Sequence, residues 1–367
     1  MLFHPFEIAF CGYSGSGKTT LIAALIRHFS ARLSIGYYKH GCHRFDIDRE
    51  GKDSWTVKEA GALTVMISDP DKKALVTQQT GPFFHLEQQA FSGLDMLFVE
   101  GLKELPLPKL ILVDRERKIL DLVGRSSITN VAALIVSDDQ ASYSGFGIPV
   151  LHRDHIIDIA AFIESFLLEY SARSSALNGL VLAGGRSVRM GSDKALLAYH
   201  SHNQLLHTAA LLQQQCHEVF VSCREEQAET YRHFGIPLIT DSYLGIGPLG
   251  GLLSAQRANP DAAWVVAACD LPCLDTDILH QLCEERNPMR FATAYRNPDS
   301  GMLEPLLACY EPKSRHHLIE RHLEGKNSLS LFLEESHITM LMPHNSNALQ
   351  NINDSFGQQG VGRSQPH

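Results

Sequence analysis

Short apolar runs recur along the chain and alternate with segments that have helical periodicity. The runs are rich in β-branched and aromatic residues, as expected for strands that are buried on both faces. Strands that alternate with helices are typical of βαβ units, so the pattern predicts an α/β fold with parallel sheets. The predicted strands cover residues 8–11, 34–38, 94–99, 132–136, 180–183, 219–222 and 264–268.

The length of the chain indicates two domains, because 367 residues exceed what one hydrophobic core usually organises. An amphipathic helix predicted over residues 154–170 is followed by a small polar stretch at 171–176, and a new strand begins directly afterwards. We therefore predict domains at residues 1–170 and 177–354, joined by a linker at 171–176. The glycine-rich polar tail, residues 355–367, is expected to be disordered.

Charge and composition narrow the class of protein. A net charge of −9 argues against a general binder of nucleic acids or anionic membranes, because such proteins carry a basic excess. The chain has neither a leader-like start nor an apolar run long enough to cross a bilayer. Its eight cysteines are scattered rather than arranged as a disulfide framework. These features lead us to expect a cytoplasmic protein with reduced thiols.

A phosphate-binding loop follows the first predicted strand. Residues 12–19 read Gly-Tyr-Ser-Gly-Ser-Gly-Lys-Thr, which fits the Walker A pattern, and a helix is predicted after them. In such a loop the backbone N–H groups point at phosphates, the lysine neutralises β- and γ-oxygens, and the hydroxyl binds Mg²⁺. The residues expected to bind nucleotide are Gly12, Gly15, Gly17, Lys18 and Thr19.

A second acidic ligand is expected at the end of the strand at 94–99. Glu100 follows this strand and precedes Gly101, which places a carboxylate at the carboxyl edge of the sheet, where ligands of α/β proteins bind. Glu100 is therefore the candidate partner of Thr19 at Mg²⁺. The loop alone does not distinguish ATP from GTP, and no Asn-Lys-x-Asp box follows the later strands.

These residues resemble the MobB family, the GTP-binding adaptors of molybdenum cofactor synthesis. The match covers roughly residues 6–170 and includes the Walker A loop, a Lys-His-rich segment at 39–54, Ala-Gly-Ala at 60–62 and Val-Glu-Gly-Leu-Lys at 99–103. The resemblance implies GTP binding with weak hydrolysis and a partner role toward a nucleotidyltransferase. By analogy, it also implies a homo-oligomer formed through the N-terminal domain.

A second glycine-rich loop opens the other half of the chain. Residues 182–194 combine glycines with several cations directly after a predicted buried strand. A loop that offers both cationic side chains and backbone N–H groups can bind a nucleoside triphosphate and stabilise the charge of its departing pyrophosphate. The residues expected to act here are Leu182, Ala183, Gly184, Gly185, Arg189 and Lys194.

Two carboxylates accompany this loop. Asp270 ends the apolar run at 264–268 and is the candidate Mg²⁺ ligand. Asp241 precedes a second glycine-rich segment that contains Gly247. In nucleotidyl transfer, a metal held by such carboxylates offsets charge that develops on the α-phosphoryl and leaving oxygens.

Residues 177–354 resemble MobA, the molybdenum cofactor guanylyltransferase. The matching motifs are Leu-Ala-Gly-Gly-x-Ser-x-Arg-Met-Gly-x-Asp-Lys from 182, Gly-Pro-Leu-x-Gly from 247, Cys-Asp-x-Pro from 269, Glu-Pro-Leu-Leu-Ala from 304 and Asn-Ile-Asn from 351. By resemblance, Lys194 contacts phosphate, Asp270 binds Mg²⁺, and Asn351 and Asn353 lie toward molybdopterin.

The two resemblances together predict a fused guanylyltransferase and GTP-binding adaptor. Its substrates would be GTP and molybdopterin, in the free or molybdenum-loaded form. Its partners would be other proteins of molybdenum cofactor synthesis and apo-molybdoenzymes. Two further hypotheses stay open. One is a cytidylyltransferase of the same pterin or a sugar-1-phosphate nucleotidyltransferase, and the other is a GTP-switched carrier or chaperone of the cofactor.

Overall fold

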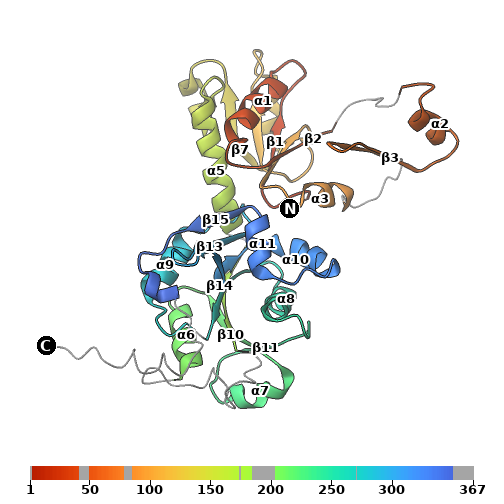
Figure 1. Cartoon of the computed structure of the whole chain (residues 1–367). Coiled ribbons are helices and arrows are strands. Elements are labelled where there is room, and N and C mark those ends of the chain that lie inside the picture. Colours follow the sequence, from red (N-terminus) through yellow and green to blue (C-terminus); the bar gives the residue numbers. More distant parts are fainter. Residues whose placement is uncertain are drawn as a thin grey trace. The chain divides into compact units, whose positions relative to one another are not determined.

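The chain divides into two compact units, Met1–Leu167 and Leu168–His367. The computed structural model describes residues 2–40, 49–77, 85–172, 175–183, 203–269 and 271–349. Each unit is built around its own sheet, with helices packed against it (Figure 1). The α/β class with two sheets, predicted from the alternation of strands and helices, is confirmed.

The first unit contains a six-stranded sheet in the order β2-β5-β1-β6-β7-β8, with every neighbouring pair parallel. Its inner strands β1 and β5 are buried along their whole length, which explains their largely apolar sequences. The elements around this sheet are β1 (Glu7–Cys11), α1 (Lys18–Phe29), β2 (Ile35–Lys39), α3 (His85–Phe91), β5 (Met96–Glu100), β6 (Lys109–Leu112), α4 (Lys118–Gly124), β7 (Val131–Val136), the 3₁₀ helix η1 (Gln140–Phe146), β8 (Val150–His152) and α5 (Ile156–Ala172).

An antiparallel ribbon of two strands, β3 (Thr64–Ser68) and β4 (Lys73–Thr77), also belongs to the first unit. Helix α2 (Asp53–Glu59) precedes it and buries no residue. The ribbon exposes large apolar side chains, among them Met66 and Ile67. It therefore lies outside the core of the six-stranded sheet, and its own alternation was too short to be predicted from the sequence.

The second unit contains a seven-stranded sheet in the order β11-β10-β9-β12-β14-β13-β15. The first four strands are parallel, but β14 runs antiparallel to both of its neighbours. Its elements are β9 (Leu177–Leu182), α6 (Gln204–Leu212), β10 (Glu218–Cys223), α7 (Glu225–Arg232), β11 (Leu238–Thr240), α8 (Pro248–Ala258), β12 (Ala263–Ala268), α9 (Thr276–Glu284), β13 (Ala292–Arg296), β14 (Leu303–Tyr310), α10 (Ser314–Leu323), α11 (Leu329–Glu335), β15 (Ile338–Leu341) and the 3₁₀ helix η3 (Ser346–Leu349).

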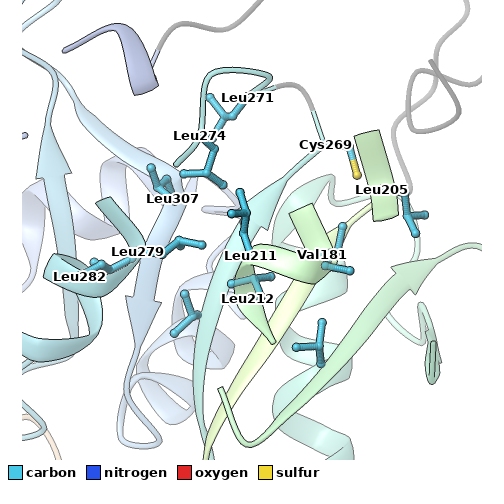
Figure 2. Close-up of a cluster of buried hydrophobic side chains, with 14 of the residues drawn as sticks. Val181, Leu205, Leu211, Leu212, Cys269, Leu271, Leu274, Leu279, Leu282 and Leu307 are labelled. Carbon is cyan, nitrogen blue, oxygen red and sulfur yellow. The ribbon is translucent and has the colours of Figure 1, made fainter. Parts of the chain in front are cut away.

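Both faces of this second sheet are covered. Val181 of β9 packs with Leu205 and Leu212 of α6 and with Leu279 of α9 in one buried cluster (Figure 2). Its chain neighbour Leu180 belongs to a separate cluster with residues of α8, α10 and α11. Successive side chains of a strand point to opposite faces, so β9 must be apolar at adjacent positions.

The expectation that both sheets are parallel is wrong for the second unit, because β14 reverses direction. β13 and β14 were absent from the predicted strands, since Arg296, Glu304 and Pro305 interrupt their apolar pattern. The predicted helix at 154–170 is present as α5, which continues to Ala172 and thus into the expected linker. Among the helices described, none is both long and apolar enough to span a membrane.

Candidate functional site

The Walker A loop joins β1 to α1. Gly15 and Gly17 adopt left-handed backbone angles, with φ of +77° and +88°. Gly17 is the N-cap of α1 and provides no side-chain cap, so the first N–H groups of the helix face the loop. Lys18 donates from Nζ to the carbonyl oxygens of Gly12 and Tyr13, at 3.0 and 2.9 Å. The loop therefore has the shape and the free donors of an anion site.

The side chains of Thr19 and Glu100 meet beside this loop. Thr19 Oγ1 donates to Glu100 Oε2 at 2.9 Å, and Tyr37 donates its hydroxyl proton to the same oxygen at 2.8 Å. Lys39 Nζ lies 3.3 Å from Glu100 Oε1. The parallel pairing of β2 with β5 sets Lys39 directly opposite Glu100, which explains this contact.

The network around Glu100 keeps its carboxylate charged. Burial acts to raise the pKa of Glu100, but hydrogen bonds from Tyr37, Thr19 and Lys39 outweigh it and hold the pKa below its ordinary value. A hydroxyl and a charged carboxylate form an oxygen donor set that fits Mg²⁺, which takes one or two protein oxygens besides phosphate and water. Thr19 and Glu100 could hold that ion. The sequence did not indicate Tyr37, and Lys39 appeared only as part of a polar segment.

In the second unit, the carboxyl ends of β9, β10 and β11 bring a group of predicted residues together. Leu182 ends β9, and the N–H of the buried Ala183 donates to Ser222 O at 3.1 Å. Ser222 Oγ donates to Asp241 Oδ1 at 2.8 Å, and Asp241 is the residue that follows the end of β11. Burial raises the pKa of Asp241, although Ser222 and the charge of Arg224 act to lower it. Ser222 was missed because a single serine at a strand end gives no distinctive pattern.

Helix α8 approaches these strand ends closely through its glycines. Gly247 is its N-cap with φ of +66°, and Pro248 occupies its first turn. A Cβ on Gly251 would lie 2.4 Å from Ser222 Oγ and 2.8 Å from Leu182 Cδ2. A Cβ on Gly250 would lie 2.3 Å from Tyr243 O. Only glycine allows the amino end of α8 to lie against β9 and β10, where its dipole favours an anion.

The reversed strand β14 adds a carboxylate at the same edge of the sheet. Ala267 of β12 pairs with Leu307 of β14, so the start of β14 lies level with the carboxyl end of β12. Glu304 stands at that start and accepts a hydrogen bond of 2.8 Å from Asn297 Nδ2. The motif containing Glu304 was recognised in the sequence, but its position at this edge depends on the strand reversal.

Several predicted site residues lie outside the described part of the chain. They are Gly184, Gly185, Arg189, Lys194, Asp270, Asn351 and Asn353. Within the described residues, no three His, Cys, Asp or Glu side chains gather as a metal site. The roles expected for these seven residues therefore stay predictions.

Comparison with known proteins gives a match in each half. Residues 7–137 match the family model described as molybdopterin guanine dinucleotide synthesis protein B. Residues 179–339 match the MobA-like NTP transferase domain. These matches confirm both resemblances drawn from the sequence.

Individual relatives agree with this division. A molybdenum cofactor biosynthesis bifunctional protein from Synechocystis is 30% identical over 233 residues, which cover 62% of this chain and 64% of that protein. A molybdopterin-guanine dinucleotide biosynthesis adapter protein from Haemophilus influenzae is 42% identical over 109 residues, covering 29% of this chain and 61% of the adapter. The chain thus spans a little under two thirds of the length of these two relatives.

A third relative is matched over most of its length. A probable molybdenum cofactor guanylyltransferase from Thermococcus kodakarensis is 32% identical over 160 residues, which cover 43% of this chain and 78% of that protein. The chain therefore belongs to the molybdenum cofactor guanylyltransferase family through its second unit, and carries a MobB domain in its first.

Proposed function

We propose that the second unit transfers GMP from GTP to molybdopterin or its molybdenum-loaded form. The observation that carries the proposal is the cluster at the carboxyl ends of β9, β10 and β11. There the half-buried Asp241 and the glycine-rich amino end of α8 lie together, in a chain of the guanylyltransferase family. A carboxylate and a helix N-terminus that no side chain caps suit a nucleoside triphosphate with a bound cation.

The reaction needs no protein nucleophile. An oxygen of the terminal phosphate of molybdopterin attacks the α-phosphorus of GTP, a new P–O bond forms, and the bond to the β-phosphate oxygen breaks. Pyrophosphate leaves toward Arg189 and Lys194, which we assign to neutralise its charge. Mg²⁺ held by Asp270 would supply further neutralisation of the α-phosphoryl oxygens. The remaining contribution is positioning, in which Asn351 and Asn353 hold the pterin side.

The first unit is proposed to bind GTP with weak hydrolysis and to act as an adaptor. Lys18 and the backbone of the Walker A loop would hold the phosphates, and Thr19 and Glu100 would hold Mg²⁺. Fusion to the second unit raises the effective concentration of each active surface near the other. We further propose cytoplasmic localisation, transfer of the product to apo-molybdoenzymes, and homo-oligomerisation through this unit.

Pyrophosphate release from each nucleoside triphosphate, with molybdopterin and Mg²⁺ supplied, tests the proposed transferase. Release with GTP alone supports guanylyl transfer, whereas release with CTP would assign the protein to cytidylyl transfer. A folded protein that binds nucleotide but releases no pyrophosphate would instead act as a carrier of the cofactor.

Substitution of Asp270 tests the metal assignment separately. We expect Asp270→Asn to abolish turnover while the unfolding transition stays where it is. Asp261→Asn is a matched control, because Asp261 is exposed and precedes the amino end of β12. Full activity in the Asp270 variant would remove this residue from the proposed mechanism.

A further inference from the structure

Arg153 places a guanidinium group directly over the Walker A loop. It follows β8, and its backbone N–H donates to Val136 O at 2.8 Å. A Cβ on Gly17 would lie 2.1 Å from Arg153 Nη2 and 3.3 Å from Arg153 Cζ. The guanidinium therefore fills the space beside the Cα of Gly17, at the N-cap of α1.

Among the described residues, the acids that follow β7 and Arg153 make no hydrogen bond or ion pair with the Arg153 guanidinium. Asp138, beyond the end of β7, accepts hydrogen bonds from Arg117 and Tyr143 at 2.8 and 2.7 Å. Asp139 accepts from the N–H of Ala141 at the start of η1. Asp154 lies 3.9 Å from His152.

Arg153 itself is half-buried, and within the described ranges its guanidinium makes no hydrogen bond or ion pair. A guanidinium carries five N–H donors, and partial burial without acceptors costs free energy. The two lysines of the same site, in contrast, already have acceptors. Lys18 contacts carbonyl oxygens, and Lys39 contacts Glu100. Arg153 thus has the charge and the free donors that an anionic ligand in this loop would satisfy.

We propose that Arg153 binds the phosphates of the nucleotide held by the first unit. This inference rests on the proposed nucleotide binding by that unit. In Walker A loops the backbone N–H groups cradle the α- and β-phosphates, while the lysine reaches the β- and γ-phosphates. Arg153 lies over the backbone of Gly17, so its guanidinium contacts α- and β-phosphate oxygens. It should contribute equally to diphosphate and triphosphate binding.

Calorimetric titration of the full chain with GDP and GTP, in the presence of Mg²⁺, tests this role. The second unit is also proposed to bind guanine nucleotide, so two binding events are expected. The event that disappears in Lys18→Ala is the one that belongs to the first unit. We expect Arg153→Gln to weaken that event for GDP and GTP by the same factor, roughly 10- to 100-fold, as for loss of a hydrogen bond to a charged group. The other binding event should not change, and Arg153→Lys should restore part of the loss.

Arg32→Gln is the matched control. Arg32 follows the far end of α1, about 18 Å along the helix from the loop, and pairs with Glu164. This variant should bind both nucleotides as the native chain does, and thermal unfolding should show that Arg153→Gln folds normally.

Three results would overturn the inference. If Arg153→Gln binds GDP and GTP with native affinity, Arg153 does not contact the phosphates. If nucleotide affinity falls but inorganic tripolyphosphate competes as well as before, Arg153 contacts the purine or ribose instead. If the native chain shows no binding event that depends on Lys18, the proposed nucleotide function of the first unit itself fails.

Discussion

Thr19 donates its hydroxyl hydrogen bond to Glu100 at 2.9 Å, although 81 positions separate the two residues in the chain. This bond links the first turn of α1 to the end of β5 and sets a hydroxyl against a charged carboxylate. It brings together the two oxygens that the sequence assigned to Mg²⁺. Their proximity follows from the parallel pairing of β1 with β5, because α1 begins shortly after the end of β1.

Loss of charge at Glu100 should weaken Mg²⁺-dependent nucleotide binding by the first unit. Glu100→Gln retains the size of the side chain and an acceptor for Tyr37, but removes the negative charge. We expect the affinity for Mg²⁺-GDP to fall about tenfold or more, as for loss of a charged ligand contact. Affinity measured in EDTA should change little. Titration with and without Mg²⁺ provides the measurement.

The control for this variant is Glu164→Gln on α5, whose carboxylate pairs with the exposed Arg32. It should leave both titrations unchanged. An equal loss of affinity in EDTA and in Mg²⁺ for Glu100→Gln would contradict a metal role and indicate a general disturbance of the loop.

Gly17→Ala should disrupt the Walker A loop mainly through its backbone, since the end of the flexible Arg153 side chain can move away from a new methyl group. The backbone at φ +88° disfavours a side chain by about 1 kcal/mol. We expect nucleotide binding by the first unit to be lost and its unfolding free energy to fall by roughly 1–3 kcal/mol. Gly93→Ala is the comparison, because a Cβ there meets no atom within 4 Å. Equal stability of the two variants would contradict this account.

Asp241→Asn should lower the guanylyl transfer activity of the second unit without lowering its stability. Because burial raises the pKa of Asp241 above its ordinary 3.8, the folded chain binds the proton more tightly than the unfolded chain. The stabilising contribution of the protonated form is complete below pH 3.8 and is lost as the pH rises through the raised pKa. An amide cannot ionise and still accepts from Ser222. The variant should therefore equal or exceed the native stability at pH 7 by up to roughly 1 kcal/mol, with the difference shrinking toward pH 4.

Guanylyl transfer by the same variant should fall by at least about tenfold, as for loss of a charged contact. Denaturant titration between pH 4 and 7, followed by fluorescence of the buried Trp264, measures the stability. A Trp55→Phe background removes the chain's other tryptophan. A variant much less stable than the native chain at pH 7 would show that ionised Asp241 stabilises the fold.

The ion pair of Arg286 and Glu311 should be important for folding of the second unit. Arg286 Nε and Nη2 donate to the two carboxylate oxygens at 3.0 and 2.8 Å, and the Glu311 side chain is fully buried. Arg286→Met would leave a buried carboxylate without its counter-charge, which costs about 3–5 kcal/mol. The double variant Arg286→Met with Glu311→Leu should recover most of this loss. Denaturant unfolding followed through Trp264 checks both, and a double variant as unstable as the single one would contradict the explanation.

The sequence predicted most of the strands with long apolar runs, but it missed the short buried strand β6. Each of the seven predicted runs corresponds to a strand. Six of these strands are largely buried, which leaves a nearly continuous apolar signal, whereas β2 is partly exposed. Strands β13 and β14 were missed because polar residues interrupt their apolar pattern. These residues lie at the carboxyl edge of the sheet and not in the core. The direction of β14 could not be predicted, because no local pattern states whether a strand runs parallel or antiparallel to a distant partner.

The candidate site was predictable where backbone geometry requires particular residues. Gly15 and Gly17 are recognisable because only glycine adopts their angles readily, and Glu100 because it ends a buried strand. Tyr37 and Arg153 could not be found in this way. Tyr37 contacts Glu100, 63 positions along the chain, and Arg153 reaches Gly17 from the end of β8. No sequence spacing marks either contact.

The strands of the two sheets do not interleave along the chain. In the described ranges, the first sheet ends with β8 at His152, before β9 begins the second at Leu177. The complete first unit therefore leaves the ribosome while the second is still being synthesised. At about 5–20 residues per second, the interval lasts roughly 10–40 s, far longer than most single domains need to fold. The first unit can thus finish co-translational folding while the second sheet is still incomplete, which limits mispairing between the strands of the two sheets.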